Sequence, residues 1–227
     1  MKIIKKSSAK YENIKALIRN RVPISKKSMR KITLPLRALH QRYFEDYIFI
    51  HINKCGGTSM ERALGMPFIN HRTAQEHRNA LGKKIWSKRY KFALVRDPYD
   101  RIGSLFFYRH KNLTLHEAKQ YFPYWLENVA EINEKKVAGP KLSPQTSWIT
   151  DSNGNTIIDQ WFKLEELDKE LEELEFRLNK KLNVSVLNKK KNKINYMELY
   201  NNQTDSILKE AFSDDFDTFG YKYRDII

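Results

Sequence analysis

The chain has 227 residues, which is long enough to bury one sizeable hydrophobic core. Hydrophobic residues make up 41% and aromatic residues 12% of the composition, which excludes a wholly disordered chain. Lys and Arg number 42 against 27 Asp and Glu, a net charge of +15, and the first 46 residues hold 13 of these basic side chains. We expect this arm either to contact an anionic partner, such as nucleic acid, acidic lipid or acidic glycan, or to be a solvated basic tail.

Cys55 is the only cysteine, so no disulfide can form within the chain, and a reducing compartment is favoured. No apolar run approaches the roughly 18 to 20 residues of a membrane span, and the first residues lack the apolar core of a signal peptide. We therefore expect a cytoplasmic protein with a basic extension over residues 1–45 and one domain over residues 46–227.

Two short apolar runs predict buried strands at 47–52 ("YIFIHI") and 90–95 ("YKFALV"). Each run is followed by turn residues and then by a helical pattern. This order predicts an α/β fold with a mainly parallel sheet, whose ligands bind at the carboxyl ends of the strands.

Asp97 and Pro98 form a good helix start, because Asp can cap free amides and Pro suits the first helical position. A "DSNGN" turn is expected at 151–155 and a basic loop at 187–196. The patterns predict helices, in chain order, at 98–108, 113–133, 164–182 and 197–212.

The loop "NKCGGTS" at 53–59 follows the first predicted strand. Glycines let the backbone approach an anion closely, amides at a helix start point toward it, and Lys54 adds a positive charge. The loop therefore predicts a phosphate or sulfate site, although the glycines could instead serve a tight turn. A Walker A loop is excluded, because Lys54 precedes the glycines.

A second candidate anion site follows the second predicted strand. Arg96 ends that strand, and Ser104 lies on the following helix. A guanidinium group matches phosphate through its fork of donors, and a hydroxyl can complete the site. In the alternative interpretation, Arg96 pairs with Asp97 or Asp100 and Ser104 only packs.

Together these stretches resemble sulfotransferases that use 3′-phosphoadenosine 5′-phosphosulfate (PAPS), in the branch of the bacterial and Golgi carbohydrate enzymes. "HINKCGGTSM" is similar to the family's 5′-phosphosulfate loop, "VRDPYDRIGSLFFY" to its 3′-phosphate element, and "NHRTAQEH" to a segment with a functional histidine. The resemblance covers roughly residues 47–223 and implies a P-loop-like three-layer fold, with a central mainly parallel sheet flanked by helices.

The resemblance also implies roles for individual residues. Arg96 and Ser104 would hold the 3′-phosphate of PAPS, and Asn188 and Lys189 would contact the nucleotide unless the basic loop is only a solvated charge run. No metal is expected. The 5′-phosphosulfate would be held by Lys54, Cys55, Gly56, Gly57, Thr58 and Ser59.

The implied reaction is an in-line transfer of the sulfuryl group to a hydroxyl of a carbohydrate or glycolipid acceptor. Lys54 would stabilise the leaving phosphate, and His71 is the preferred general base, because imidazole titrates near neutral pH. His51, His77 and Glu76 are the competing candidates. Gln145 and Trp148 would help to shape the acceptor cleft, unless the aromatic Trp148 only packs in the core.

A second interpretation belongs to another class: a non-catalytic, basic nucleic-acid-binding protein on a P-loop-like fold. The enzyme interpretation is preferred, because the basic excess lies mainly in the arm, whereas the domain carries the predicted donor-site residues. No nucleic acid is then expected as a partner. The enzyme would be bacterial and cytoplasmic, with the arm able to hold it at the inner membrane face or on a polyanion.

Overall fold

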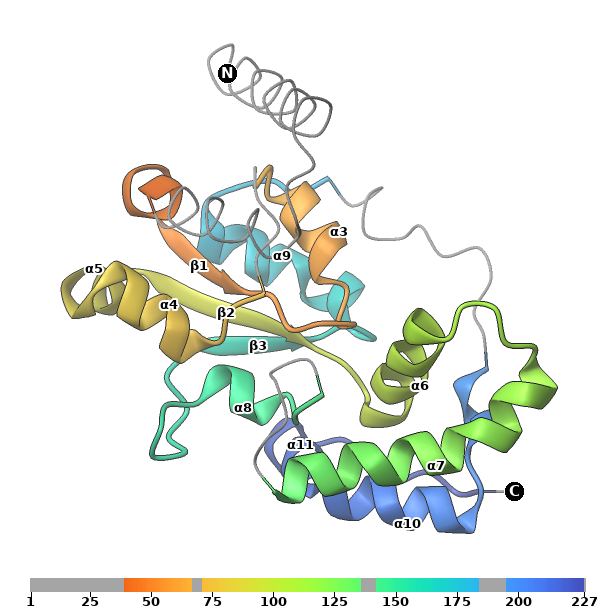
Figure 1. The fold of residues 1–227 in the computed structure, drawn as a ribbon. Helices are drawn as coiled ribbons and strands as arrows, with labels where there is room; N and C mark the ends of the chain where they lie inside the picture. The colour runs from red at the N-terminus through yellow and green to blue at the C-terminus, as the bar shows by residue number, and fades with distance from the viewer. Residues whose placement is uncertain (1–38, 67–70, 136–141, 184–194, 227) are drawn as a thin grey trace, which may run out of the picture.

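The computed structural model describes residues 39–66, 71–135, 142–183 and 195–226. Within these ranges the fold is mixed α/β, with a small sheet of three parallel strands among helices (Figure 1). The strands are β1 (Tyr47–Ile50), β2 (Tyr90–Val95) and β3 (Gln160–Lys163), in the order β1-β2-β3. The register pairs Phe49 with Phe92 and Val95 with Lys163, so the carboxyl ends of all three strands meet at one edge.

Helices connect the three strands and make up most of the described chain after β3. A helical segment at 39–44 precedes β1. The others are α3 (Gly57–Ala63), α4 (Ala74–Leu81), α5 (Lys83–Lys88), α6 (Pro98–Arg109), α7 (Leu115–Glu134), α8 (Thr146–Ile149), α9 (Leu167–Leu178), η2 (Tyr196–Leu199), α10 (Asn202–Ala211) and α11 (Ser213–Phe219).

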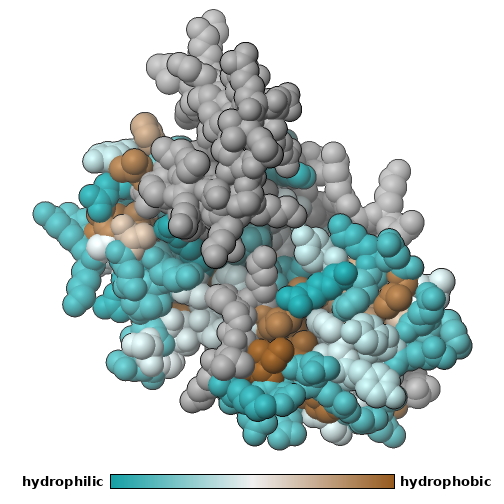
Figure 2. Space-filling model, in the orientation of Figure 1, coloured by the Kyte–Doolittle hydropathy of each residue, from teal (hydrophilic) through white to brown (hydrophobic). Residues whose placement is uncertain are grey.

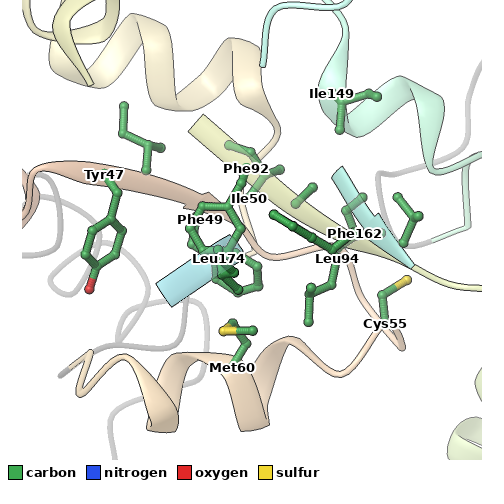
Figure 3. Packing of buried hydrophobic residues seen from close by; sticks show 14 of the residues in the cluster. Tyr47, Phe49, Ile50, Cys55, Met60, Phe92, Leu94, Ile149, Phe162 and Leu174 are labelled. Atoms are coloured by element: carbon green, nitrogen blue, oxygen red, sulfur yellow. The ribbon is translucent and has the colours of Figure 1, made fainter. Parts of the chain in front are cut away.

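The first hydrophobic cluster surrounds the sheet. Phe49 and Phe92 lie on adjacent strands with ring centroids 5.1 Å apart, and Met60 of α3 and Leu174 of α9 belong to the same cluster (Figure 3). Every residue of β1 is buried. Such continuous burial is typical of parallel strands with helices on both sides, and it explains why the apolar runs predicted the first two strands.

A second hydrophobic cluster joins the helices that follow β2. Phe106 of α6 packs on Phe122 of α7 at 5.2 Å between ring centroids, and Leu208 and Phe216 contribute from α10 and α11. The face drawn in Figure 2 is largely hydrophilic, broken by small hydrophobic patches. The described chain thus has a sheet half and a helical half, each with its own core.

Most of the predicted elements are confirmed, with shifted ends. Strand 90–95 and the helix beginning at Pro98 are found as predicted, and α7 continues through Pro123. The helix predicted at 164–182 is shorter, since β3 and a turn precede it and Asn179 ends it in the left-handed conformation, at φ 46°. The prediction of one continuous helix at 197–212 is wrong, because Tyr200 is extended and separates η2 from α10.

Residues just before the domain boundary predicted at 45/46 contact the rest of the fold. Arg89 donates to the carbonyls of Gln41 and Arg42 at 3.3 and 3.0 Å, and Arg42 donates to the carbonyl of Leu81. Residues 1–38, most of the predicted arm, lie outside the described residues. Among the helices that are described, none is long and apolar enough to cross a membrane.

A buried polar network connects the two halves. Asp215 of α11 accepts hydrogen bonds from the backbone N–H groups of Gln145 and Thr146, both at 2.9 Å. Arg101 of α6 donates to Asn53 Oδ1 at 3.0 Å, and its Nη1 lies 3.9 Å from Asp215 Oδ2. Both charged residues are fully buried, and burial raises the pKa of Asp215, an effect that Arg101 and the hydrogen bonds oppose.

We predict that Asp215→Asn lowers the free energy of unfolding by about 3 to 5 kcal/mol, because it leaves the Arg101 charge buried without its anion. The amide nitrogen would also face N–H donors. Urea unfolding measures the effect. The matched control is Asp214→Asn, an exposed neighbour, which should change stability by no more than about 0.5 kcal/mol. Equal effects of the two substitutions would contradict the role of Asp215.

Candidate functional site

The loop between β1 and α3 lies at the carboxyl edge of the sheet. Lys54 and Gly56 both have left-handed backbones, with φ 67° and 76°, and α3 begins directly afterwards at Gly57. The amides of Ser59 and Met60 donate to the carbonyl of Gly56 at 3.0 and 3.1 Å, so the N–H groups that this turn presents beside Lys54 are those of Gly57 and Thr58. The loop therefore has the donor types that the sequence predicted for an anion site.

Both glycines of the loop also have a packing role. A Cβ added to Gly57 would lie 2.0 Å from Cδ2 of His51, and one added to Gly56 would lie 2.7 Å from Cδ1 of Leu164. A real Cβ is not found that close to another heavy atom. The tight-turn alternative therefore holds in part: the His51 ring leaves no room for a side chain at Gly57, and the φ of 76° favours glycine at position 56 whether or not an anion binds.

The side chain of Cys55 points away from the loop surface into the core (Figure 3). Its thiol donates to Oε1 of Gln145 at 3.0 Å. Burial raises the pKa of this thiol to about 12, although Arg101 and Arg96 lower it. Only the backbone of Cys55 is therefore placed to contribute to the predicted phosphosulfate site.

Arg96 lies on the adjacent strand end, next to the loop. Its Nη1 donates to the carbonyl oxygen of Lys54 at 3.3 Å, and its guanidinium carbon lies 5.4 Å from the ring centroid of Tyr196. Its Nη2 also lies 3.7 Å from Oδ2 of Asp100, so the ion pair of the alternative interpretation is present. The side chain of Gln145 binds the backbone N–H and C=O of Arg96, both at 2.8 Å, and fixes the turn.

One face of α6 meets the loop. The helix begins as predicted, with Asp97 accepting from the Tyr99 amide at 2.9 Å and Pro98 in the first turn. Arg101 donates to Asn53, and Nζ of Lys54 lies 4.3 Å from the ring centroid of Tyr108. Because residues three and four apart share a helix face, Ser104 lies between these two contacts, and it is buried there.

The histidines occupy different environments. Nδ1 of His71 lies 3.4 Å from the carbonyl oxygen of His51, and the two rings are 4.1 Å apart. His51 is buried, with Nδ1 3.0 Å from Oε1 of the buried Glu61, which indicates a structural role. His77 is also buried. Glu76 accepts from the Thr73 amide at 2.7 Å in a capping box, which gives this carboxylate a structural task.

Two aromatic residues near the candidate site were not predicted. Tyr108 and Tyr196 contact Lys54 and Arg96, respectively. The four-residue spacing from Ser104 could have indicated Tyr108, whereas only tertiary structure reveals Tyr196. Asn188 and Lys189, the predicted nucleotide contacts, lie outside the described residues.

The suggested acceptor-cleft residues are buried. Gln145 and Trp148 both have 0% exposure, and Trp148 contacts His71 edge-on at 6.5 Å between ring centroids. The core-packing alternative therefore describes Trp148 better, while the side chain of Gln145 is held by buried hydrogen bonds to Cys55, Arg96 and Asp215. A cavity of about 560 Å³ lies elsewhere, between α7 and the α10–α11 pair. In the described ranges, no three His, Cys, Asp or Glu side chains are grouped to hold a metal ion.

Comparison of the chain with protein-family models, with curated proteins and with solved structures found no match. The geometry of this site and the sequence motifs are therefore the basis for a functional proposal.

We predict that Gly57→Ala lowers the free energy of unfolding by about 1 to 3 kcal/mol, because the new methyl group would overlap the His51 ring. Urea unfolding of the purified variant measures this cost. Thr58→Ala, a change at the next residue of the same helix, is the control and should cost less. A Gly57→Ala variant as stable as the wild type would refute the packing role.

Proposed function

We propose that the protein is a PAPS-dependent sulfotransferase that transfers a sulfuryl group to a hydroxyl of a carbohydrate acceptor. We also assign its three-strand sheet and surrounding helices to the P-loop-like three-layer class. The observation that carries the proposal is the 3.3 Å contact between Nη1 of Arg96 and the carbonyl of Lys54. It joins two sequence-distant elements, each predicted to bind one end of the same donor.

The chemistry of PAPS supports this assignment. The molecule carries anionic groups at the 5′ and 3′ positions of one adenosine, so its site needs two sets of anion donors. The β1–α3 loop supplies Lys54, two hydroxyl groups and the amides of Gly57 and Thr58 at the start of α3. The β2–α6 connection supplies Arg96 and Ser104. These donor types fit the group, and the three motifs occur in the order that the family resemblance requires.

In the proposed step, the acceptor oxygen attacks sulfur opposite the leaving phosphate oxygen. The new O–S bond forms as the bond between sulfur and the phosphate oxygen breaks, which gives a sulfate ester and adenosine 3′,5′-bisphosphate. Lys54 and the loop amides stabilise the charge that grows on the leaving phosphate. Their rigid placement at the strand end aligns donor and acceptor.

His71 is suited to take the acceptor proton. A backbone carbonyl only accepts hydrogen bonds, so the contact with the His51 carbonyl places the proton of a neutral His71 ring on Nδ1. The lone pair then lies on Nε2, which is the atom that we assign as the base. Glu76 is already used in the capping box, and His51 pairs with Glu61, which favours His71 among the candidates.

The first experiment is calorimetric titration with adenosine 3′,5′-bisphosphate, beside adenosine 5′-monophosphate. We expect the bisphosphate to bind more tightly, and Arg96→Gln to weaken it about tenfold or more by removing a charge partner of the 3′-phosphate. Binding of the monophosphate should change little.

The charge-matched control is Arg109→Gln, at an exposed position near the end of α6, which should leave both affinities unchanged. Equal binding of the two nucleotides by folded wild-type protein would contradict the proposal. Salt-sensitive binding of nucleic acid in that case would favour the non-catalytic alternative.

A second prediction concerns sulfuryl transfer. Lys54→Ala and His71→Ala should each lower kcat for transfer from PAPS to a sugar acceptor by about 10²- to 10⁴-fold, the usual contribution of a positioned acid, base or charge. Transfer of labelled sulfate from PAPS, assayed against a panel of glycans, measures it. His116→Gln, an exposed change on α7, is the control. If Glu76→Gln loses more activity than His71→Ala, the base is wrongly assigned.

A further inference from the structure

The carboxyl-terminal segment 220–226 lies against the turn that begins α6. Arg224 is its main charged contact: Nη2 lies 2.8 Å from Oδ2 of Asp97, and Nη1 lies 3.4 Å from Oδ1 of Asp100. The other oxygen of Asp100 is the one that lies 3.7 Å from Arg96. One carboxylate is therefore shared between a residue of the candidate site and a residue of the carboxyl-terminal segment.

We propose that Arg224 is a positioning residue for the 3′-phosphate site: by pairing with Asp97 and Asp100, it keeps the charge of Arg96 available to an anionic ligand. The inference rests on the proposed function and assigns a role to a segment that the donor-site motifs do not include. Arg224 acts on Arg96 through the two carboxylates, and its guanidinium carbon also lies 5.5 Å from the ring centroid of Tyr99.

The charges at this turn explain why the pairing matters. The side chains of Asp97 and Asp100 are 10% and 12% exposed, and that of Arg96 is 5% exposed, so solvent screens them weakly. Asp97, Asp100, Arg96 and Arg224 together carry no net charge. Without Arg224, the other three would sum to −1, and Glu165, which accepts from the Asp97 amide at 3.0 Å, would add to that negative charge, so an approaching phosphate would be repelled.

Geometry points to the same consequence. The 3.7 Å separation of Arg96 and Asp100 is longer than a hydrogen bond, while Arg224 makes the shorter contact to Asp97. Once released by Arg224, Asp100 would be free to form a closer pair with Arg96. That pair would occupy the guanidinium donors that a 3′-phosphate needs.

The segment has attachments that do not depend on Arg224. Lys163 donates to the carbonyl of Gly220 at 3.0 Å, the Tyr221 hydroxyl donates to Glu165 at 3.0 Å, and the ring of Tyr223 lies 4.6 Å from that of Phe216. A substitution at Arg224 should therefore leave the segment in place and change mainly the charge at the turn.

The test measures, by calorimetry, the ratio of the dissociation constant of adenosine 5′-monophosphate to that of adenosine 3′,5′-bisphosphate, which isolates the contribution of the 3′-phosphate. We expect Arg224→Gln to reduce this ratio about tenfold. Arg224→Lys should reduce it less, because an ammonium keeps the charge but cannot bridge both carboxylates as well. Lys222→Gln removes an equal charge from an exposed position of the same segment and should leave the ratio unchanged.

A double variant separates positioning from loss of structure. Asp100→Asn combined with Arg224→Gln returns the summed charge of positions 96, 97, 100 and 224 to zero, so the ratio should recover to within about twofold of the wild type. An unchanged ratio in Arg224→Gln, or no recovery in the double variant, would overturn the inference while leaving the donor site intact. A wild-type protein without any 3′-phosphate preference would overturn the proposed function itself, and this inference with it.

Discussion

The buried contact of Arg101 with Asp215 is the constraint on which the arrangement of the two halves depends. Removing both charges from water costs several kcal/mol, which a 3.9 Å ion pair alone does not recover. The surrounding hydrogen bonds from Gln145 and Thr146 to Asp215, and from Arg101 to Asn53, add to the compensation, while Nη1 of Arg101 has only the ion pair with Asp215. Such a network of directional contacts favours one geometry, so it specifies how the helical half meets the sheet.

The same network holds the candidate site together, because it contacts both the loop after β1 and the turn after β2. Asn53 begins the loop of β1, and Gln145 holds the backbone of Arg96 at the end of β2 while accepting from Cys55. The loop and the Arg96 turn are therefore fixed relative to one another by buried groups rather than by a ligand. A site with this support is preorganised, which lowers the cost of binding an anionic ligand.

Local patterns predicted the parts of the fold that follow from local physics. The continuous apolar runs indicated β1 and β2, and Asp97 with Pro98 indicated the start of α6. Strand β3 was missed because "QWFK" is short, partly exposed and poor in β-branched residues, so its pairing depends on β2. Arg96 and the loop could be proposed as anion sites from residue types, but Tyr196 could not, since its position over Arg96 depends on tertiary packing.

The balance of charge within the candidate site follows from its burial. A guanidinium as buried as that of Arg96 needs a nearby anion when no ligand is bound, and Asp100 supplies it at 3.7 Å. An anion that paired too closely would compete with the ligand, whereas a distant one would leave the charge uncompensated. Sharing Asp100 with Arg224 resolves this conflict, because the carboxylate neutralises Arg96 without being committed to it. The carboxyl-terminal segment is thus part of the electrostatics of the site, although it lies far from the loop in sequence.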